Sequence, residues 1–495
     1  MSTTLFKMAN ASFKHRNEVF YDNFNWTVKE KENWIITGPC GAGKTSLVNA
    51  LSGKYYLVKG SLSYPFLEES GDSIYSIKKK LIRVVSFRDD SRVFSPNLYF
   101  YQQRFNAFAA DGTLTVWEYL MNAGFDERIK EHIDLVKKMG VYPMLDLERI
   151  KLSSGQSRRL LITKAILQEP KILIIDNPYL GLDAPSRKEF NILLDNLVKE
   201  SGIQLILSGH YKELPKCISH ELCLSNFKVN YAGPISTNTT NEAALPILST
   251  EIIEKIKVLY TSPTNSSNNI FDLKNVKVAY GDALILDHIN WTVNKGEKWA
   301  LLGDNGSGKS TILSLLFGDH TQAYANDIYL FGTKRGMGQS IWDIKKNTGF
   351  TSPELHYFFS YELSCLQTVI SGLFDHVYLK RSPDEKEQQL IDLLFDYFEL
   401  AHLKDQSFQN VSTGEQRTIL FLRALVKNPP LLLLDEPFQG LDAVTIYKAK
   451  QLLSSILTAE HTLVFISHYV TEIPDTVGFY AYLENGVLRV NLDNH

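Results

Sequence analysis

Several features that would assign the chain to a particular partner or compartment are missing. The 495 residues include four cysteines, and Cys40, Cys217, Cys223 and Cys365 follow no zinc-finger or iron–sulfur spacing. Such sparse cysteine usage is typical of proteins that work in a reducing cytosol. The net charge is only −3, so the composition gives no global electrostatic indication of nucleic-acid binding.

Long apolar runs are also missing. No stretch approaches the roughly 18–20 apolar residues that a membrane-spanning helix needs. Residues 1–10 lack a basic segment followed by a long apolar one, so we expect no signal peptide. We therefore expect a cytoplasmic chain. If it serves a membrane transporter at the inner face of the plasma membrane, the membrane-spanning part is another polypeptide.

The most informative segment that is present is glycine-rich. Gly303–Thr311 follows the apolar run Trp299–Leu302 and precedes a second one, Ile312–Leu316, a pattern that predicts strand, loop and helix. Glycines let successive backbone N–H groups surround a phosphate, and the helix N-terminus adds donors and a positive dipole end. We expect Lys309 to reach the terminal phosphates and Ser310 to ligate Mg²⁺.

The same pattern occurs earlier in the chain, at Gly38–Thr45. Trp26–Val28 recurs as Trp291–Val293 at the offset that separates the two phosphate-loop lysines. Further matches at nearly the same offset are Gly155 with Gly414, Asp183 with Asp442, and His210 with His468. A nearly constant offset over so many features indicates a duplicated domain.

The duplication defines the expected domain organisation. The first domain spans 1–228, a linker spans 229–269, and the second domain spans 270–495. Ser236–Asn241 and Thr261–Asn269 are polar and turn-rich, as expected of a linker. Ile252–Leu259, between them, fits either a short strand or a helix.

Two short apolar runs end in carboxylates. Lys171–Pro178 and Leu431–Pro437 read as strands buried on both faces, as in a parallel sheet. An acid at the carboxyl end of such a strand lies at the ligand edge of the sheet. We therefore expect Asp176 and the Thr45 hydroxyl to be Mg²⁺ ligands in the first half. In the second half we expect Asp435 and the Ser310 hydroxyl to play the same part.

The residue after each aspartate differs between the two halves. Glu436 can position or deprotonate an attacking water. Asn177 stands at the matching place in the first half, and an amide cannot accept a proton at neutral pH. Each half then has a strand that ends in a histidine, His210 or His468. A single histidine there is usually structural, but two at matching places favour a role at the site.

Two serine–glycine segments, Ser153–Gln156 and Ser412–Gln416, open helices expected over 159–167 and 417–426. A serine cap followed by glycine offers N–H groups and a dipole end to an anion, although helix caps of this kind are common.

Aromatic residues leave further alternatives open. Tyr280 could stack on a nucleotide base or simply pack, and by offset its partner is His15. Segments 98–105 and 351–359 are expected to be surface loops that lead to helices over 113–121 and 367–374. Their aromatic side chains could form a docking site or pack the helical subdomain.

In their order along the chain, these motifs resemble the nucleotide-binding domain of ABC ATPases, present twice. The resemblance implies an α/β fold with two tandem P-loop NTPase (ABC-type) domains, each with a mixed-sheet core and a helical subdomain. Among twin proteins, the chain is most similar to the ModF/PhrA type of molybdate-transport-like ATP-binding proteins. Val85–Phe87 and Thr351–His356 stand where other families have a strand that ends in Gln, and they carry this finer resemblance.

The resemblance also implies that two halves, within one chain or between two chains, close over ATP and Mg²⁺. Site one would contain Gly38, Pro39, Cys40, Gly41, Ala42, Gly43, Lys44, Thr45, Asp176, Asn177 and His210, with Ser412, Thr413, Gly414 and Glu415 from the other half. Site two would contain Gly303, Asp304, Asn305, Gly306, Ser307, Gly308, Lys309, Ser310, Thr311, Asp435, Glu436, His468 and Tyr280, with Ser153, Ser154, Gly155 and Gln156. Glu436, His468 and Lys309 are the expected catalytic residues.

The chain departs from the family pattern in three places. Asn177 replaces the catalytic glutamate, so we expect site one to bind ATP but to turn it over slowly. Ser154 and Thr413 each replace a consensus glycine of the signature. The glutamine-loop residue is Gln102 or Gln103 in the first half, and Glu354 is nearest in the second.

Three functions are compatible with these motifs. The first is ATP hydrolysis that energises an ABC transporter, with the aromatic segments receiving permease subunits. The second is a soluble ATPase acting on the ribosome or on nucleic acid, although the chain lacks the long charged linker and the cysteine clusters of such relatives. The third is a regulatory ATP switch with low turnover, which Asn177 supports.

Overall fold

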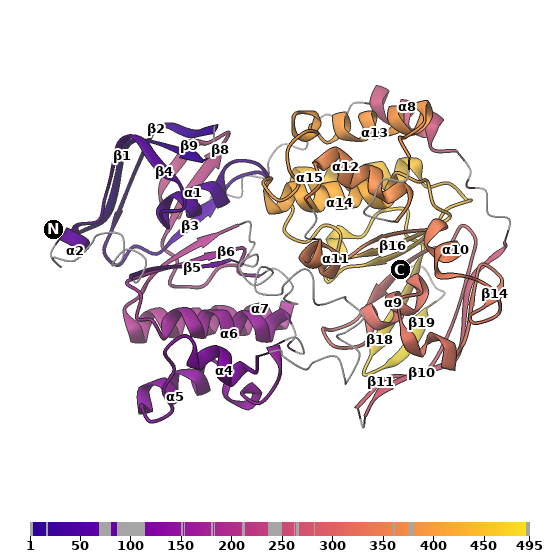
Figure 1. Cartoon of the computed structure of the whole chain (residues 1–495), viewed down its shortest axis with the longest axis horizontal. Helices are drawn as coiled ribbons and strands as arrows, with labels where there is room; N and C mark the ends of the chain where they lie inside the picture. The colour runs from indigo at the N-terminus through magenta and orange to yellow at the C-terminus, as the bar shows by residue number, and fades with distance from the viewer. Residues whose placement is uncertain are drawn as a thin grey trace. The chain divides into compact units, whose positions relative to one another are not determined.

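The chain folds into two compact units, Met1–Asn241 and Glu242–His495, in a computed structural model (Figure 1). The structure describes residues 3–15, 18–68, 81–86, 114–149, 152, 154–179, 182, 184–209, 213–235, 250–261, 263, 267–281, 283–359, 362–375 and 381–491. Within these ranges, no helix combines the length and the apolar character that crossing a bilayer requires. Both units are α/β, as predicted.

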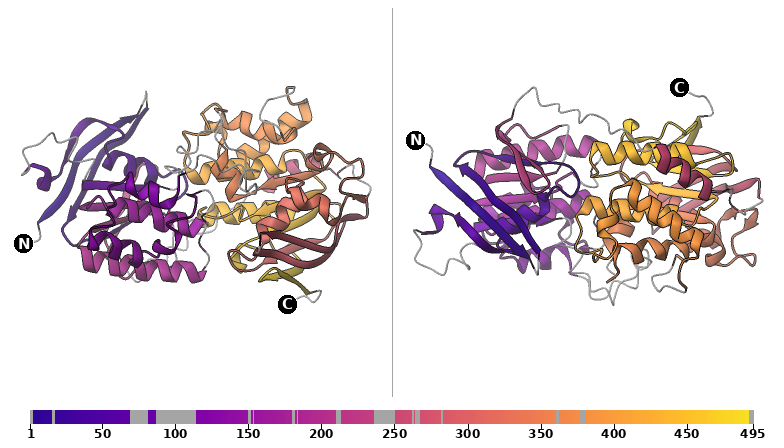
Figure 2. Two further views of the ribbon diagram at one scale, coloured as in Figure 1. Left: turned by 60° about the horizontal axis from the view of Figure 1, so that its bottom comes forward. Right: turned by 90° about the horizontal axis from the view of Figure 1, so that it is seen from above.

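Unit 1 contains two sheets. An antiparallel sheet of order β2-β1-β4 forms one layer, visible as the indigo strands in Figures 1 and 2. A six-stranded sheet has the order β5-β6-β7-β3-β8-β9, with every pair parallel except β8 and β9. The strands are β1 (Thr4–His15), β2 (Glu18–Lys29), β3 (Trp34–Thr37), β4 (Tyr56–Ser63), β5 (Ile82–Ser86), β6 (Ile172–Asp176), β7 (Gln204–Ser208), β8 (His220–Ser225) and β9 (Lys228–Pro234).

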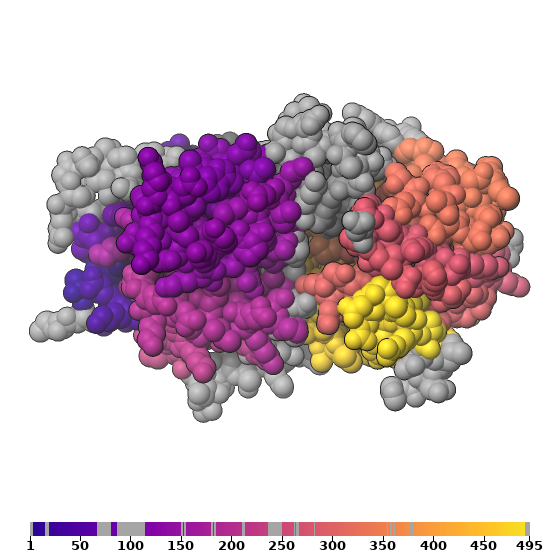
Figure 3. Space-filling view, turned by 90° about the horizontal axis from the view of Figure 1, so that it is seen from below, coloured from indigo at the N-terminus to yellow at the C-terminus, as the bar shows by residue number. Residues whose placement is uncertain are grey.

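The helices of unit 1 cover its six-stranded sheet. One hydrophobic cluster joins Val116, Val136 and Leu160 on three helices to Leu173 and Leu205 on the central strands. Seen from below, the purple segment that carries α4 and α5 and the later magenta residues of the unit form one continuous surface (Figure 3). The helices are α1 (Lys44–Leu51), α2 (Pro65–Glu68), α4 (Val116–Met121), α5 (Lys130–Lys138), the 3₁₀ turn η2 (Tyr142–Met144), α6 (Ser154–Ile166) and α7 (Ala184–Ser201).

Unit 2 repeats this arrangement. Its antiparallel sheet has the order β11-β10-β13-β14, and its six-stranded sheet has the order β15-β16-β17-β12-β18-β19. All pairs of the larger sheet are parallel except β18 and β19. The strands are β10 (Asn269–Tyr280), β11 (Ala283–Asn294), β12 (Lys298–Leu302), β13 (Asp327–Leu330), β14 (Thr333–Lys334), β15 (Thr348–Thr351), β16 (Leu431–Asp435), β17 (Thr462–Ile466), β18 (Phe479–Glu484) and β19 (Val487–Asn491).

The helical elements of unit 2 include α-helices and 3₁₀ turns, and the first of them, α8, precedes the first strand of the unit. They are α8 (Thr250–Leu259), α9 (Lys309–Phe317), η4 (Thr321–Ala325), α10 (Ile341–Lys346), α11 (Pro353–Phe358), α12 (Cys365–Ile370), η5 (Ser371–Leu373), α13 (Glu385–Tyr397), η6 (Ala401–Leu403), α14 (Thr413–Leu425), α15 (Ala443–Ile456) and η7 (Val470–Glu472). The helices expected over 367–374 and 417–426 therefore exist, with boundaries that begin a few residues earlier.

The tryptophans that revealed the repeat also hold the two sheets of each unit together. Trp26 on β2 meets Trp34 on β3 edge to face, with ring centroids 5.4 Å apart. Trp291 on β11 meets Trp299 on β12 in the same way, at 5.6 Å. Edge-to-face aromatic pairs add about 0.5–1.5 kcal/mol beyond the area that they bury. The duplicated sequence feature is therefore a duplicated core contact.

The prediction of a surface loop over 351–359 is wrong, because this segment contains helix α11. The Ser352 hydroxyl caps it by accepting a hydrogen bond from the Leu355 N–H, and Pro353 occupies the first helical position. The segment is also packed inward: His356 is buried against Gln416 of α14, and Phe359 is buried against Phe408. Packing of the helical subdomain therefore explains these two side chains.

The expected linker 229–269 contains regular structure. Part of β9 lies in it, and Ile252–Leu259, which fitted either a strand or a helix, belongs to helix α8. Helix α8 is part of unit 2 and lies beside α13 (Figure 1). The domain limits at 228 and 270 stay a prediction.

A buried histidine anchors the chain just after α8. The Thr458 N–H donates to Nδ1 of His461, so Nε2 of His461 carries the proton and donates to Asn428 Oδ1, 2.8 Å away. The Asn428 amide in turn donates to the Thr261 carbonyl, and the Tyr260 ring stacks on the imidazole. Burial lowers the pKa of His461 to about 4, so the ring is neutral at pH 7.

This network predicts an acid-sensitive unit 2. The folded-state pKa of His461 lies below its unfolded value of about 6.5. The contribution of the neutral ring to the free energy of unfolding is therefore complete above pH 6.5. It is lost as the pH falls towards 4, because the unfolded chain then binds a proton that the folded state does not. The loss should reach about 3 kcal/mol. His461→Gln keeps one acceptor and one donor but cannot titrate. We expect the free energy of unfolding of this variant to lack the part of the pH dependence that His461 supplies. The measurement is urea denaturation at several pH values, followed by hydrogen exchange in β17. Equal pH dependence in both proteins would contradict the assignment.

Candidate functional site

The phosphate loop of unit 2 requires glycine at two places. It joins the end of β12 to the start of α9. Gly303 has a φ of 147°, and a Cβ there would lie 2.2 Å from the Leu483 carbonyl oxygen. Gly308 has a φ of 106°, and a Cβ there would lie 2.7 Å from a methyl group of Leu286. The glycine pattern therefore reflects backbone conformation and close packing, as a loop that curls around an anion needs.

The loop lysine of each unit folds over its own loop. Lys309 Nζ donates to the carbonyl oxygens of Gly303 at 2.7 Å and Asp304 at 2.8 Å. Lys44 Nζ donates likewise to Gly38 at 2.5 Å and Pro39 at 2.8 Å. Each ammonium group is thus held at its loop by acceptors that phosphate oxygens could replace.

Each loop hydroxyl meets the aspartate predicted to lie at the sheet edge. Ser310 Oγ donates to Asp435 Oδ2 at 3.3 Å, and Thr45 Oγ1 donates to Asp176 Oδ2 at 3.0 Å. Both aspartates end fully buried strands. A hydroxyl and a carboxylate that converge are the oxygen donors that Mg²⁺ prefers, so these pairs fit the metal that such a site would hold. Their metal-binding role stays a prediction.

Glu436 lies directly beside His468. The Glu436 backbone has a φ of 45°, and its N–H donates to the Ile466 carbonyl of the neighbouring strand. This places Glu436 Oε1 2.7 Å from His468 Nε2, with both side chains largely buried. Burial alone would raise the pKa of Glu436, but the close contact with His468 and the charges of Arg417 and Lys309 hold it below its usual value. The carboxylate is therefore ionised at neutral pH.

Unit 1 has the same backbone with an amide in place of the carboxylate. Asn177 has a φ of 54°, and its N–H donates to the Ser208 carbonyl at 2.8 Å. Its side-chain amide donates to Asp176 Oδ1 at 3.3 Å. An amide held in this way cannot accept a proton from water. Unit 1 therefore keeps the left-handed backbone conformation at this position but lacks the carboxylate that could act as a base.

The serine–glycine segment of unit 2 caps helix α14. The Ser412 hydroxyl accepts from the Glu415 N–H at 3.3 Å, and the Glu415 carboxylate accepts from the Ser412 N–H at 2.7 Å. Thr413 is the first residue of α14, and Gly414 is buried. This capping box already uses two backbone donors, so an anion here would meet the helix end through other groups. In unit 1, Gly155 and Gln156 lie in the first turn of α6.

Some predictions fall where the structure is not described. Outside the described residues lie Ser153, Asp183, His210, the segment 98–105 with Gln102 and Gln103, and the side chains of His15, Ser154 and Glu354.

Tyr280 is tied to a buried histidine. The Gln322 N–H donates to Nδ1 of His320, so Nε2 of His320 donates to the Tyr280 hydroxyl, 2.7 Å away. The Tyr280 ring also packs partly against the core of unit 2. Packing therefore accounts for Tyr280, and base stacking stays a prediction.

The motifs did not point to Tyr21 or Arg417. In unit 1, the buried Tyr21 hydroxyl donates to the Gly43 carbonyl at 2.5 Å, and the Phe227 ring covers the place where a Cβ of Gly43 would lie. In unit 2, Arg417 of α14 donates to Gln439, three residues after Glu436. Arginine follows the signature in both halves, at 158 and 417, and this repetition was the signal available in the sequence.

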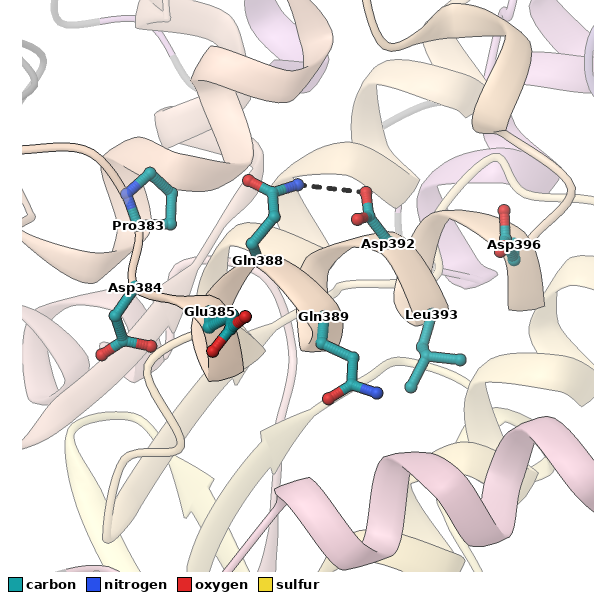
Figure 4. A pocket seen from close by; sticks show the side chains of 8 residues that line it. All are labelled: Pro383, Asp384, Glu385, Gln388, Gln389, Asp392, Leu393 and Asp396. Atoms are coloured by element: carbon teal, nitrogen blue, oxygen red, sulfur yellow. Dashed lines mark hydrogen bonds between the residues drawn. The ribbon is translucent and has the colours of Figure 1, made fainter.

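A surface depression along α13 does not fit a nucleotide (Figure 4). Its lining includes Asp384, Glu385, Asp392 and Asp396, with the Gln388 amide donating to Asp392 at 3.1 Å. Carboxylates at this density would repel a polyphosphate. The two phosphate loops therefore stay the candidate nucleotide sites.

The comparison with protein families decides the identity of this arrangement. The family model described as ABC transporter matches residues 21–180 and 286–439, one match in each unit. The chain belongs to the ABC transporter family of ATP-binding proteins. Each match includes the phosphate loop and the strand-end aspartate of its unit, so the predicted family is confirmed.

Two relatives of this family match almost end to end. An uncharacterized ABC transporter ATP-binding protein of Schizosaccharomyces pombe is 32% identical over 98% of this chain and 99% of its own length. The ABC transporter ATP-binding protein ModF of Escherichia coli is 31% identical over 90% of each chain. The predicted similarity to ModF is therefore confirmed.

Solved structures of tandem ABC proteins share the fold. The structure titled as ribosome-bound archaeal Pelota and ABCE1 has a TM-score of 0.57, covering 97% of this chain and 78% of that one, at 18% identity. The structure titled RNase-L Inhibitor has a TM-score of 0.54, covering 97% and 89%, also at 18% identity. At this identity, the likeness extends to the fold alone.

The loop geometry predicts that Gly303→Ala removes one nucleotide site. The new Cβ would meet the Leu483 carbonyl at 2.2 Å in a conformation that side chains rarely adopt. Titration with a fluorescent ATP analogue should show the binding stoichiometry falling from two to one. Gly478→Ala is the matched control, since its Cβ would meet no atom within 4 Å. Two sites of wild-type affinity in Gly303→Ala would contradict the assignment.

Proposed function

We propose that the chain binds ATP at two composite sites and hydrolyses it mainly at the site that contains Glu436. The observation that carries this proposal is the contact between Glu436 and His468 beside the Ser310–Asp435 pair. Unit 1 has Asn177 at the place of the base. ABC ATPases act on ATP, so the family gives the reaction class and the two units differ in their capacity to perform it.

At the Glu436 site, each residue has a distinct role. Lys309 and the loop N–H groups bind the terminal phosphates and offset their charge. The ionised Glu436 orients the attacking water and accepts its proton, while His468 keeps the carboxylate in place. Ser310 and Asp435 would hold Mg²⁺, which neutralises charge on the phosphates when bound.

We further propose that each site is completed by the signature of another unit. The loop Gly303–Thr311 would meet Ser153–Gln156, and the loop Gly38–Thr45 would meet Ser412–Glu415. The completing unit belongs either to the same chain or to a second copy of it, which would supply the same segments. Support comes from the presence of one loop and one signature in each unit, as closure in pairs requires.

For the biological role, we propose a cytoplasmic ATPase that energises an ABC transporter whose membrane-spanning subunits are separate chains. The ModF relative, similar over 90% of both chains and named an ABC transporter ATP-binding protein, supports this role. The molybdate-type solute is what the sequence resemblance implies. Action on the ribosome is the second candidate. It is favoured by the tandem structures whose titles name ribosomal complexes, although these share only the fold.

The proposed division of labour predicts that Glu436→Gln abolishes most steady-state hydrolysis. Loss of a general base typically lowers the rate by about 10²–10⁴-fold. ATP binding should persist, because the loops are unchanged. Asn177→Ala is the matched control, and we expect its kcat to stay within about twofold, since no base is removed. Wild-type ATPase in Glu436→Gln would refute the proposal, and slow turnover in the wild type would favour a regulatory ATP switch.

The partner is tested with the Glu436→Gln protein bound to ATP. In the transporter role, a tagged chain should copurify with a membrane-spanning polypeptide from detergent-solubilised membranes and should not sediment with ribosomes in a sucrose gradient. ATP-dependent sedimentation with ribosomes, without any membrane polypeptide, would favour the second candidate.

A further inference from the structure

Arg417 connects two functional segments of unit 2. It lies in α14, five positions after the signature residue Ser412, and only 5% of it is exposed. Its Nη1 donates to the Gln439 carbonyl oxygen at 2.5 Å, and its Nη2 donates to Gln439 Oε1 at 3.1 Å. Because a guanidinium has donors only, the amide oxygen of Gln439 must face it. The bidentate contact therefore fixes both the backbone and the side chain of Gln439.

Gln439 closes the turn that begins at Glu436. The Gln439 N–H donates to the Glu436 carbonyl at 3.2 Å. Glu436 itself has a φ of 45°, a left-handed conformation that an L-residue keeps only when its surroundings hold it. The residues after the turn lead to Asp442, which caps α15 through the Thr445 N–H. A contact at Gln439 therefore bears directly on the placement of Glu436.

We propose that Arg417 is a positioning residue for Glu436, which ties the signature helix α14 to the turn that carries the catalytic base. The proposal rests on the function proposed above for Glu436. Any movement of α14 when its signature meets a nucleotide would be passed to this turn. Arg417 thus links the segment that serves one site to the base that serves the other.

Unit 1 contains a version of the same connection. Arg158 of α6 is buried and donates to the Asn177 carbonyl, the first residue of the matching turn. The link between the signature helix and the turn is therefore present in both units, with different acceptors. Only in unit 2 does the turn carry a carboxylate, so only there can the link affect proton transfer.

A purely structural role for Arg417 predicts a different outcome from a positioning role. A buried guanidinium that served packing alone would affect stability and the amount of folded protein. A positioning residue affects kcat at an unchanged KM, because a misplaced base weakens the transition state and leaves ATP binding intact. A conservative lysine should then restore part of the rate, since its ammonium group can still donate to the Gln439 carbonyl.

The test compares full-length Arg417→Met, Arg417→Lys and Arg423→Met by steady-state kinetics and thermal denaturation. We expect Arg417→Met to lower kcat by about 10–100-fold with KM within about twofold, and Arg417→Lys to recover part of the loss. Arg423 is the matched control. It is buried on the same helix and donates to Ser371 Oγ at 2.9 Å, so its loss should lower the melting temperature but leave kcat within about twofold.

Gln439→Leu provides a second variant if Arg417→Met fails to fold. It removes the 3.1 Å contact and leaves the carbonyl contact, and leucine already stands at the matching position 180 of unit 1. We expect kcat to fall about three- to tenfold at unchanged KM. Wild-type kcat in Arg417→Met or in Gln439→Leu, or equal kcat losses in Arg417→Met and Arg423→Met, would overturn the proposal.

These outcomes separate the inference from the function on which it rests. If Glu436→Gln retains wild-type ATPase, the proposed function is wrong. If Glu436→Gln is inactive and Arg417→Met keeps its kcat, only the role of Arg417 is wrong.

Discussion

The parallel pairing of β12 with β17, and of β17 with β16, is the constraint on which the candidate site of unit 2 depends. Carboxyl ends of parallel strands lie at one edge of a sheet, so three distant segments leave the sheet together. β12 leads into the phosphate loop, β16 ends at Asp435, and β17 leads to His468. The contacts of Ser310 with Asp435 and of Glu436 with His468 follow from this pairing.

Duplication kept this scaffold and changed the chemistry on it. Both units have the same strand order in the six-stranded sheet, the same tryptophan pair between sheets and the same hydroxyl–aspartate contact. They differ at one side chain after the buried strand, where Asn177 replaces the carboxylate of Glu436. The left-handed backbone at this position is common to both, so it belongs to the scaffold and not to the base. One fold therefore carries a carboxylate at this position in unit 2 and an amide in unit 1.

The errors of sequence interpretation have physical causes. Segment 351–359 was expected to be a surface loop leading to the helical subdomain, yet Ser352 and Pro353 start a helix and the fold buries His356 and Phe359. Ile252–Leu259 was ambiguous because a short segment that mixes apolar and charged residues fits a strand or a helix equally. Arg417 was overlooked because charged residues on helices are usually solvated, whereas this one meets a turn on another element.

The sequence by itself determined the two phosphate loops, the strand-end aspartates, the duplication and the half that lacks a glutamate. These are local patterns, because glycine conformation, strand burial and side-chain chemistry are written in neighbouring residues. Only the tertiary structure decided which partners these groups meet. Three contacts join separate elements: His468 with Glu436, Arg417 with Gln439, and the Asn428 amide with the Thr261 carbonyl. Such contacts arise from strand order and helix packing, which no local pattern specifies.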